Sequence, residues 1–216
     1  IKHIKHLNNL LKLENLYFVQ NKIHVIENLD GLKSLKNLEL GGNKIQRISE
    51  SLLGLPTLKQ LWLGQNRITK FENLDSLKNL RILSIQSNRI EHINGLDSLE
   101  NLQELYVSHN KLTSIEGLDN LKKLEILDIT GNKISKIENM KHLKHLTDFW
   151  ASYNLIDSFE NIHDELGELP SLETVYFEGN PLQLKNPTQY RTKVKINLGK
   201  SLRKIDALYI ASNRMV

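Results

Sequence analysis

The chain has 216 residues, of which 39% are hydrophobic and none is cysteine. That length allows one sizeable core, and the lack of cysteine excludes a disulfide framework and fits a reducing compartment only weakly. No apolar run is longer than a few residues and no charged-then-apolar leader is visible, so neither a membrane span nor a secretory signal is predicted. A net charge of +4 and a pI of about 9.1 would by themselves leave nucleic acid open as a partner.

The first twelve residues have the pattern of a return path from a repeat that began earlier. Their apolar side chains stand at every third position, as Ile1, Ile4, Leu7 and Leu10. We therefore expect further repeats before Ile1 and no cap at this end of the chain.

A single motif, L-x-x-L-x-L-x-x-N, then recurs eight times and dominates the chain. Its closing asparagines lie 22 or 23 residues apart, except for a last interval of 26, and stand at positions 21, 43, 66, 88, 110, 132, 154 and 180. Such regular spacing predicts a stack of equivalent structural units.

The spacing within a unit explains its structure. The L-x-L alternation places both leucines on one face of a short strand, and neighbouring strands must stack to bury that face. The asparagine follows where the chain turns, so its side chain can bond backbone groups that the turn leaves unpaired, and stacked asparagines would form a ladder. Apolar residues at every third position beyond it suit a 3₁₀-like return path, since so short a unit has no room for a long outer helix.

Two units contain extra residues. Residues 50–56 hold one extra residue, and residues 161–170 hold four, with acidic side chains at Asp164, Glu165 and Glu168. We expect the second insertion to form a short helix on the convex side, as a tolerated loop insertion.

The last stretch departs from the repeat. Pro181 follows the final asparagine, and a segment with helical spacing then runs through Tyr190, Val194 and Leu198, with Leu202, Ile205 and Asp206 after it. We interpret this stretch as a capping unit that closes the end of the core. The expected fold is an α/β solenoid: a leucine-rich-repeat horseshoe with a parallel concave sheet, a short 3₁₀ or irregular convex side, repeats over residues 1–180 and a cap over residues 181–216.

The strand positions between the leucines face the concave surface, where the core does not require large apolar residues. The central position reads, in chain order, Tyr17, Glu39, Trp62, Ser84, Tyr106, Asp128, Trp150 and Tyr176. With strands about 4.8 Å apart, Trp62 and Trp150 would lie roughly 20 Å apart with Tyr106 midway. Exposed rings surrounded by carboxylates are typical of protein-binding hot spots. The competing interpretation is that these rings only stack on their neighbours and stiffen the sheet.

The predicted partner-binding residues combine this row with flanking positions: Tyr17, Glu39, Trp62, Glu104, Tyr106, Asp128, Asp148, Trp150, Tyr153 and Tyr176. The acidic members, with Glu178, imply a positively charged patch on the partner and disfavour a phosphate backbone. The short side chain of Ser84 predicts a weak contact at that point of the row. Basic residues instead follow the asparagines, and we interpret them as a solvated edge whose alkyl stems cover the turn: Lys22, Lys44, Arg67, Arg89, Lys111 and Lys133.

Catalysis and metal binding find little support in the sequence. His142 and His145 are spaced like a return-path pair, and no cysteine or carboxylate set completes a zinc site. Asp128 and Asp148 stand in adjacent repeats like a catalytic carboxylate pair, but they line an open groove that does not exclude water. We therefore expect no catalytic residue, no metal and no cofactor.

The C-terminal stretch is more specific than the repeats. It reads ETVYFEGNPLQ from Glu173, YR at 190–191 and LRKIDA at 202–207. Together with the repeats, this closely resembles the leucine-rich-repeat regulatory subunits of protein phosphatase 1, the Sds-twenty-two type, over essentially the whole chain. The repeat alone is shared with bacterial internalins and other solenoids.

The resemblance implies a eukaryotic, largely nuclear protein, which can also occur in the cytoplasm and binds the phosphatase catalytic subunit with acidic and aromatic concave residues. It also implies a role in control and maturation of that phosphatase and in chromosome segregation. We expect a non-catalytic subunit, monomeric before complex formation, with no nucleic-acid or membrane partner.

Two alternatives remain open. One is a spliceosomal-type ribonucleoprotein scaffold that binds an RNA-recognition protein, with RNA along the basic edge, which a strongly salt-dependent RNA affinity would support. The other is a surface adhesin of internalin type, against which the cap argues.

Overall fold

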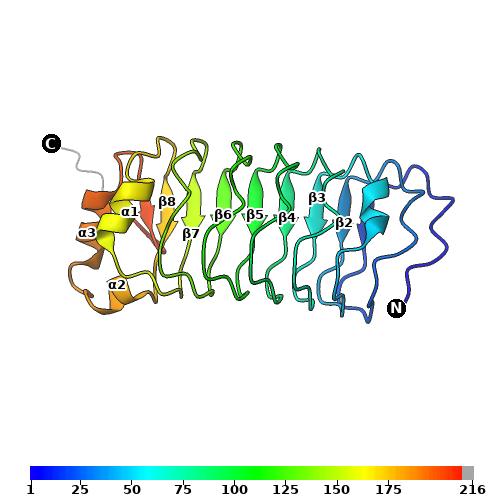
Figure 1. Ribbon diagram of the computed structural model, residues 1–216, viewed down its shortest axis with the longest axis horizontal. Coiled ribbons are helices and arrows are strands. Elements are labelled where there is room, and N and C mark those ends of the chain that lie inside the picture. Colours follow the sequence, from blue (N-terminus) through cyan, green and yellow to red (C-terminus); the bar gives the residue numbers. More distant parts are fainter. Residues whose placement is uncertain (211–216) are drawn as a thin grey trace.

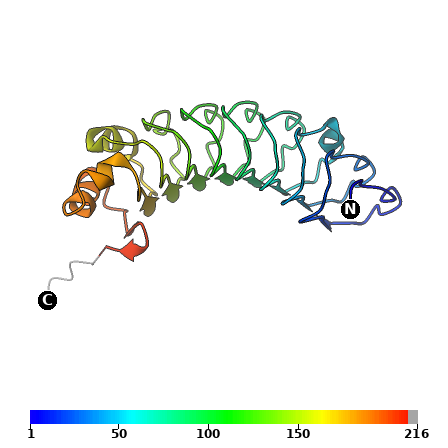
Figure 2. The same cartoon turned by 90° about the horizontal axis from the view of Figure 1, so that it is seen from below.

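The computed structural model describes residues 1–210 as a curved stack of repeats with helices at its C-terminal end (Figure 1). Figure 2 shows the stack as an arc, with the strands on the inner curve and the connecting loops on the outer curve. Ten strands form one sheet in chain order, and the first nine are parallel. The predicted leucine-rich-repeat horseshoe with a parallel concave sheet is confirmed.

Each of the eight repeat strands is three residues long, and its middle side chain points into the core. They are β1 (Asn15–Tyr17), β2 (Asn37–Glu39), β3 (Gln60–Trp62), β4 (Ile82–Ser84), β5 (Glu104–Tyr106), β6 (Ile126–Asp128), β7 (Asp148–Trp150) and β8 (Thr174–Tyr176). Because side chains alternate along a strand, the first and third residues face the concave surface. The strands pair in register, so Tyr17 lies beside Glu39 and Glu39 beside Trp62, and equivalent positions form continuous rows.

The asparagines from Asn43 to Asn180 connect each repeat to the one before it. In all seven, the side-chain oxygen accepts a hydrogen bond from a backbone N–H of the preceding repeat, as Asn66 does from Ile45 at 3.0 Å. The side-chain nitrogen of Asn66 donates to the carbonyl oxygens of Leu63 and Leu40, one in its own repeat and one in the preceding repeat. The predicted asparagine ladder is confirmed, and it satisfies backbone groups that would otherwise be buried unpaired.

The residue before each ladder asparagine adopts a positive φ, which the sequence pattern did not reveal. These residues are Gln20, Gly42, Gln65, Ser87, His109, Gly131, Tyr153 and Gly179. Five of the eight are not glycine, and residues other than glycine rarely adopt a positive φ. The turn therefore depends on the hydrogen bonds of the following asparagine and not on glycine.

The convex side is made of short turns with two helical segments, of which the sequence predicted only the second. The 3₁₀ helix η1 (Glu50–Gly54) occupies the first insertion, and α1 (Phe159–Leu166) occupies the second. The backbone N–H of Asn161 donates to the Ser158 hydroxyl, which caps α1. The short helix expected from the 161–170 insertion is thus confirmed, although it begins two residues earlier.

The stretch beyond Asn180 contains two helices and an additional hairpin. They are α2 (Pro181–Leu184), α3 (Tyr190–Asn197), β9 (Lys204–Ile205) and β10 (Leu208–Tyr209). Helix α3 agrees with the predicted helical spacing, whereas the antiparallel β9–β10 pair was not expected. Since β9 continues the sheet from β8, the boundary between repeats at 1–180 and a cap at 181–216 stays a prediction, and residues 211–216 lie outside the described part.

Asp206 holds the hairpin and α3 to the last repeat. Its carboxylate accepts hydrogen bonds from the backbone N–H groups of Phe177 and Glu178 and from the Tyr190 hydroxyl, the last at 2.9 Å. The Arg191 guanidinium donates to the carbonyl oxygens of Ile205 and Leu208. These bonds fix where the hairpin stands at the end of the concave face.

The N-terminal residues lie beside the first repeat without forming a helix or strand. Ile4 and Leu7 are buried, whereas Ile1 and Leu10 are exposed, so only two of the four expected return-path residues pack into the core. Within residues 1–210, no helix combines the length and the apolar character needed to cross a membrane.

Candidate protein-binding face

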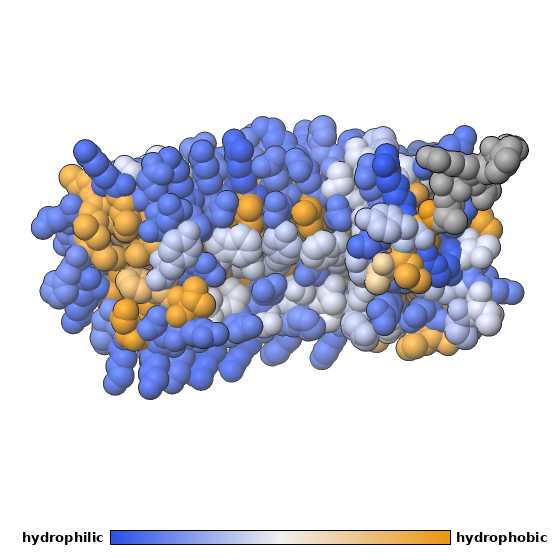
Figure 3. Space-filling model, turned by 180° about the vertical axis from the view of Figure 1, so that it is seen from behind, coloured by the Kyte–Doolittle hydropathy of each residue, from blue (hydrophilic) through white to orange (hydrophobic). Residues whose placement is uncertain are grey.

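The aromatic side chains predicted for the concave surface form a band along its middle. Figure 3 shows this face, with a pale band of intermediate hydropathy between two hydrophilic margins. The four rings are those of Trp62, Tyr106, Trp150 and Tyr176, all partly exposed at the third position of their strands. We call these four residues the ring row.

The rings of the ring row touch one another, although the strands of three of them are not adjacent. The ring centroids are 6.2 Å apart between Trp62 and Tyr106, and 6.1 Å apart between Tyr106 and Trp150. These pairs come from strands two apart, which are separated by about 9.6 Å, so the rings lean toward each other. The two tryptophan rings are consequently closer than the roughly 20 Å expected from strand spacing. Trp150 and Tyr176, on adjacent strands, meet edge to face at 6.1 Å.

The leaning rings cover the shorter side chains that lie between them, which are almost fully buried. Ser84, between Trp62 and Tyr106, is 2% exposed, and Asp128, between Tyr106 and Trp150, is 7% exposed. Asp128 also accepts a hydrogen bond from the backbone N–H of Thr130 at 3.0 Å. The expectation that Asp128 presents its carboxylate along the groove is therefore corrected, because neighbouring rings cover it and its own turn engages it.

Polar neighbours hold two of the rings in place. The Tyr106 hydroxyl donates to Glu104 at 2.7 Å, and the Trp62 indole N–H donates to Gln60 at 3.3 Å. Burial, together with this hydrogen bond and the nearby carboxylates, raises the pKa of Tyr106, so its hydroxyl stays protonated and donates. Rings that are already oriented lose less conformational freedom when a partner binds.

The remaining predicted residues lie at the ends and margins of the ring row. Tyr17 is 56% exposed at the N-terminal end, where its hydroxyl accepts a hydrogen bond from Asn37. Tyr153 lies on the turn after β7, where its ring covers Gly179: a Cβ built on that glycine would be 2.4 Å from the ring. Tyr153 is therefore a rim residue and does not extend the ring row.

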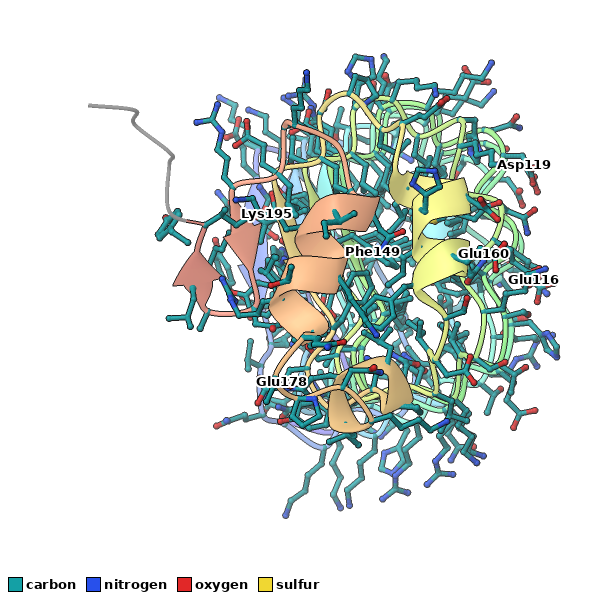
Figure 4. The ribbon with its side chains drawn as sticks, turned by 90° about the vertical axis from the view of Figure 1, so that its left-hand side faces the viewer. Glu116, Asp119, Phe149, Glu160, Glu178 and Lys195 are labelled. Carbon is teal, nitrogen blue, oxygen red and sulfur yellow. The ribbon has the colours of Figure 1, made fainter. Side chains whose placement is uncertain are left out.

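The accessible acidic side chains flank the rings. Glu39, Glu104 and Asp148 are partly exposed on the concave strands, and Asp148 accepts a hydrogen bond from the Thr147 hydroxyl at 2.9 Å. Figure 4 shows Glu178 at the lower part of the C-terminal end, near α2. A hollow of about 200 Å³ adjoins Trp62, and Glu39 forms part of its wall. Rings bordered by carboxylates complement apolar and cationic side chains of a partner.

The hairpin extends this face with two residues that the sequence argument missed. The Lys204 ammonium group lies 5.3 Å from the Tyr176 ring centroid and 5.8 Å from that of Tyr209. Contact with Tyr176 raises the pKa of Lys204, so the group remains a cation. Lys204 pairs in register with Thr174 beyond the last match to the repeat motif, and Tyr209 lies on the antiparallel β10, so the motif gave no signal for either residue.

The basic edge lies in solvent, apart from the concave strands. The ammonium group of Lys111 pairs with Glu91 at 3.4 Å, and the predicted edge residues from Arg67 onward are exposed. Within residues 1–210, no three histidine or acidic side chains gather where they could hold a metal ion.

This geometry defines a leucine-rich-repeat protein with an aromatic and acidic concave face. The leucine-rich-repeat family models match residues 12–68 and 33–90, and a two-copy model of such repeats matches residues 100–144, which together are more than half of the chain. The chain thus belongs to the leucine-rich-repeat proteins.

Within that class, the chain resembles the protein phosphatase 1 regulatory subunit SDS22. It is 59% identical to the subunit of Saccharomyces cerevisiae and 60% identical to that of Schizosaccharomyces pombe, each over 52 residues. The matched segment is 24% of this chain and only 15% of each relative. These matches confirm the resemblance to SDS22-type regulatory subunits that the sequence indicated.

Solved structures of bacterial leucine-rich-repeat proteins share the fold. A protein of Leptospira interrogans, LIC12759, is 26% identical with a TM-score of 0.77, and the alignment covers 92% of this chain and 50% of that one. Internalin C2 of Listeria monocytogenes is 30% identical with a TM-score of 0.74, over 81% of this chain and 75% of that one.

Proposed function

We propose that this protein is a non-catalytic regulatory subunit whose concave face binds the catalytic subunit of protein phosphatase 1. The observation that carries the proposal is the ring row: four partly exposed aromatic rings in mutual contact, bordered by Glu39, Glu104 and Asp148. The segmental likeness to SDS22 subunits supports the choice of partner.

The ring row suits a large folded partner. Aromatic side chains bury much apolar area at low entropic cost, and the bordering carboxylates would meet lysines or arginines of the partner. The carboxylates face an open surface from which water is not excluded, which favours binding over acid–base catalysis. Binding would control the activity or the assembly of the phosphatase.

The decisive experiment compares two pairs of substitutions in a titration with the phosphatase catalytic subunit. Trp150→Ala with Asp148→Ala removes one ring and one carboxylate from the concave face. Leu53→Ala with Glu50→Ala removes an exposed apolar and an acidic side chain from η1 on the convex side, so it is the matched control. We expect the concave pair to weaken binding by at least about 30-fold, as for a hot spot, and the control pair to change it less than about two-fold.

Two checks make the comparison decisive. Circular dichroism should show that both double variants keep the secondary structure of the parent protein. Equal affinities for the concave pair and the parent protein would refute the proposal.

We also propose a location and an assembly state that follow from the same partner. The protein would be nuclear, with a cytoplasmic pool, and monomeric until it binds the phosphatase. Size-exclusion chromatography with light scattering, with and without the catalytic subunit, tests the assembly state: a homodimer that the phosphatase leaves intact would contradict it.

A further inference from the structure

The charge of the chain is distributed unequally between its repeats and its C-terminal stretch. Residues 1–180 contain 21 basic and 24 acidic side chains, a net charge of −3. Residues 181–210 contain seven basic side chains and one acidic side chain, a net charge of +6. The positive charge of the protein is therefore concentrated at one end, beyond the acidic concave face.

The one carboxylate of this basic segment does not neutralise its surface. Asp206 is engaged by two backbone N–H groups and the Tyr190 hydroxyl. Among the cations, Arg191 donates to backbone carbonyls and Lys204 lies against two tyrosine rings. Lys195 is exposed and makes no ion pair or side-chain hydrogen bond within residues 1–210.

A hollow of about 240 Å³ lies between α3 and the β9–β10 hairpin. Its α3 wall consists of Arg191, Thr192 and Lys195, and its other walls of Ile205, Tyr209 and Ile210. Figure 4 shows Lys195 on α3, toward the hairpin. Tyr209 is 78% exposed, so one wall of the hollow is cationic and another presents an accessible aromatic side chain. We call these six residues the cap hollow.

We propose that the cap hollow binds an acidic peptide segment of a partner protein, with one apolar side chain seated between Tyr209 and Ile210. Carboxylates of the peptide would pair with Lys195 and with the exposed cations around it. This site adjoins the end of the concave face, where Tyr209 borders both, and it differs from that face in charge, so the proposal does not depend on which protein the concave face binds.

Other occupants fit the hollow less well. The chain's own residues 211–216 contain Arg214 and no acidic residue, so their charge does not complement the hollow. Single-stranded nucleic acid stacks successive bases on successive rings, but Tyr209 is the one aromatic side chain among the hollow's residues. The partly exposed apolar side chain of Ile210 would add nothing to the binding of a phosphate backbone.

The chain offers a closely matched control for the test. Thr192→Glu with Lys195→Glu reverses the charge of the cap hollow. Thr113→Glu with Lys133→Glu makes the same two substitutions, with the same change in net charge, in a hollow of about 340 Å³ on the basic edge of the repeats. All four side chains are exposed, so both variants should fold, which thermal melts would verify.

The measurement is fluorescence anisotropy with a labelled 12-residue peptide that alternates glutamate and leucine. We expect the Thr192/Lys195 variant to bind it at least about ten-fold more weakly than the parent protein, and the Thr113/Lys133 variant to stay within about two-fold. A peptide with glutamine in place of glutamate, and one with serine in place of leucine, should each bind more weakly. A Trp62→Ala and Trp150→Ala variant should bind the peptide like the parent protein, which separates this site from the ring row.

Three results would overturn the proposal. Equal losses in the two charge-reversal variants would show a general charge effect. Equal binding of the glutamine peptide would remove the acidic requirement. Tighter binding of a single-stranded RNA or of anionic lipid vesicles, lost in the Thr192/Lys195 variant alone, would assign the cap hollow to phosphate groups instead.

Discussion

The asparagine ladder predicts a large loss of stability when one member is removed. In Asn132, the side-chain oxygen accepts from the Leu112 N–H at 3.0 Å, and the side-chain nitrogen donates to the carbonyl oxygens of Ile129 at 2.8 Å and Val107 at 3.2 Å. Asn132→Ala leaves these three buried backbone groups without partners. At about 1 kcal/mol for each hydrogen bond, the free energy of unfolding should fall by about 3 kcal/mol. The melting temperature should fall by roughly 6–12 °C.

A surface asparagine provides the control. Asn79 donates a single hydrogen bond, to the Pro56 carbonyl oxygen at 2.9 Å, in an exposed position. Asn79→Ala removes the same atoms, but water can replace the lost partner, so the cost should stay below about 0.5 kcal/mol. Urea denaturation followed by circular dichroism measures both variants, with the slope of the transition checked for constancy.

An isosteric change tests the direction of the bonds. Asn132→Asp keeps the acceptor but points a carboxylate oxygen at the carbonyls of Ile129 and Val107, and burial and these carbonyls should raise its pKa in the folded protein. A raised folded pKa means that stability is lost as pH rises, so the gap between parent and variant should be larger at pH 7.5 than at pH 4. A gap that is independent of pH, or an Asn132→Ala variant no less stable than Asn79→Ala, would refute the reasoning.

Two further predictions concern the cap and the convex turns. Tyr190→Phe removes the hydroxyl that donates to the Asp206 carboxylate, so it should cost about 1.5–3 kcal/mol in thermal melts near neutral pH. Burial and that carboxylate also raise the pKa of Tyr190 in the folded protein, so the parent protein should lose stability as the pH rises above about 10. If Tyr190→Phe lost as much stability over the same pH range, this explanation would be contradicted. Gly117 and Gly95 have nearly the same positive φ, of 65° and 66°, but a Cβ on Gly117 would be 2.3 Å from the Ile93 carbonyl oxygen, whereas the nearest atom at Gly95 is 3.6 Å away. Gly117→Ala should therefore destabilise by roughly 1–3 kcal/mol more than Gly95→Ala in urea titrations, and equal losses would argue against the clash.

The sequence alone was sufficient for the repeated part of the fold. The leucines and asparagines recur at a nearly constant interval, so one local rule, applied eight times, predicts the strands, the ladder and the concave position of the four ring-row residues. The short helix at the second insertion followed from the same count, because extra residues on a crowded return path must leave the stack.

The tertiary structure decided what the side chains do between repeats. Spacing placed Trp62, Tyr106 and Trp150 in a row, but only packing brings their rings together and covers Ser84 and Asp128. A large ring can lean over a smaller residue on the adjacent strand and meet a ring two strands away. The β9–β10 hairpin was equally invisible, because its position depends on bonds from Asp206 to residues nearly thirty positions earlier. Periodicity shows which positions share a row, but not how side chains of different size pack along it, nor that Asp206 bonds to residues outside the repeat register, and only the folded chain decides both.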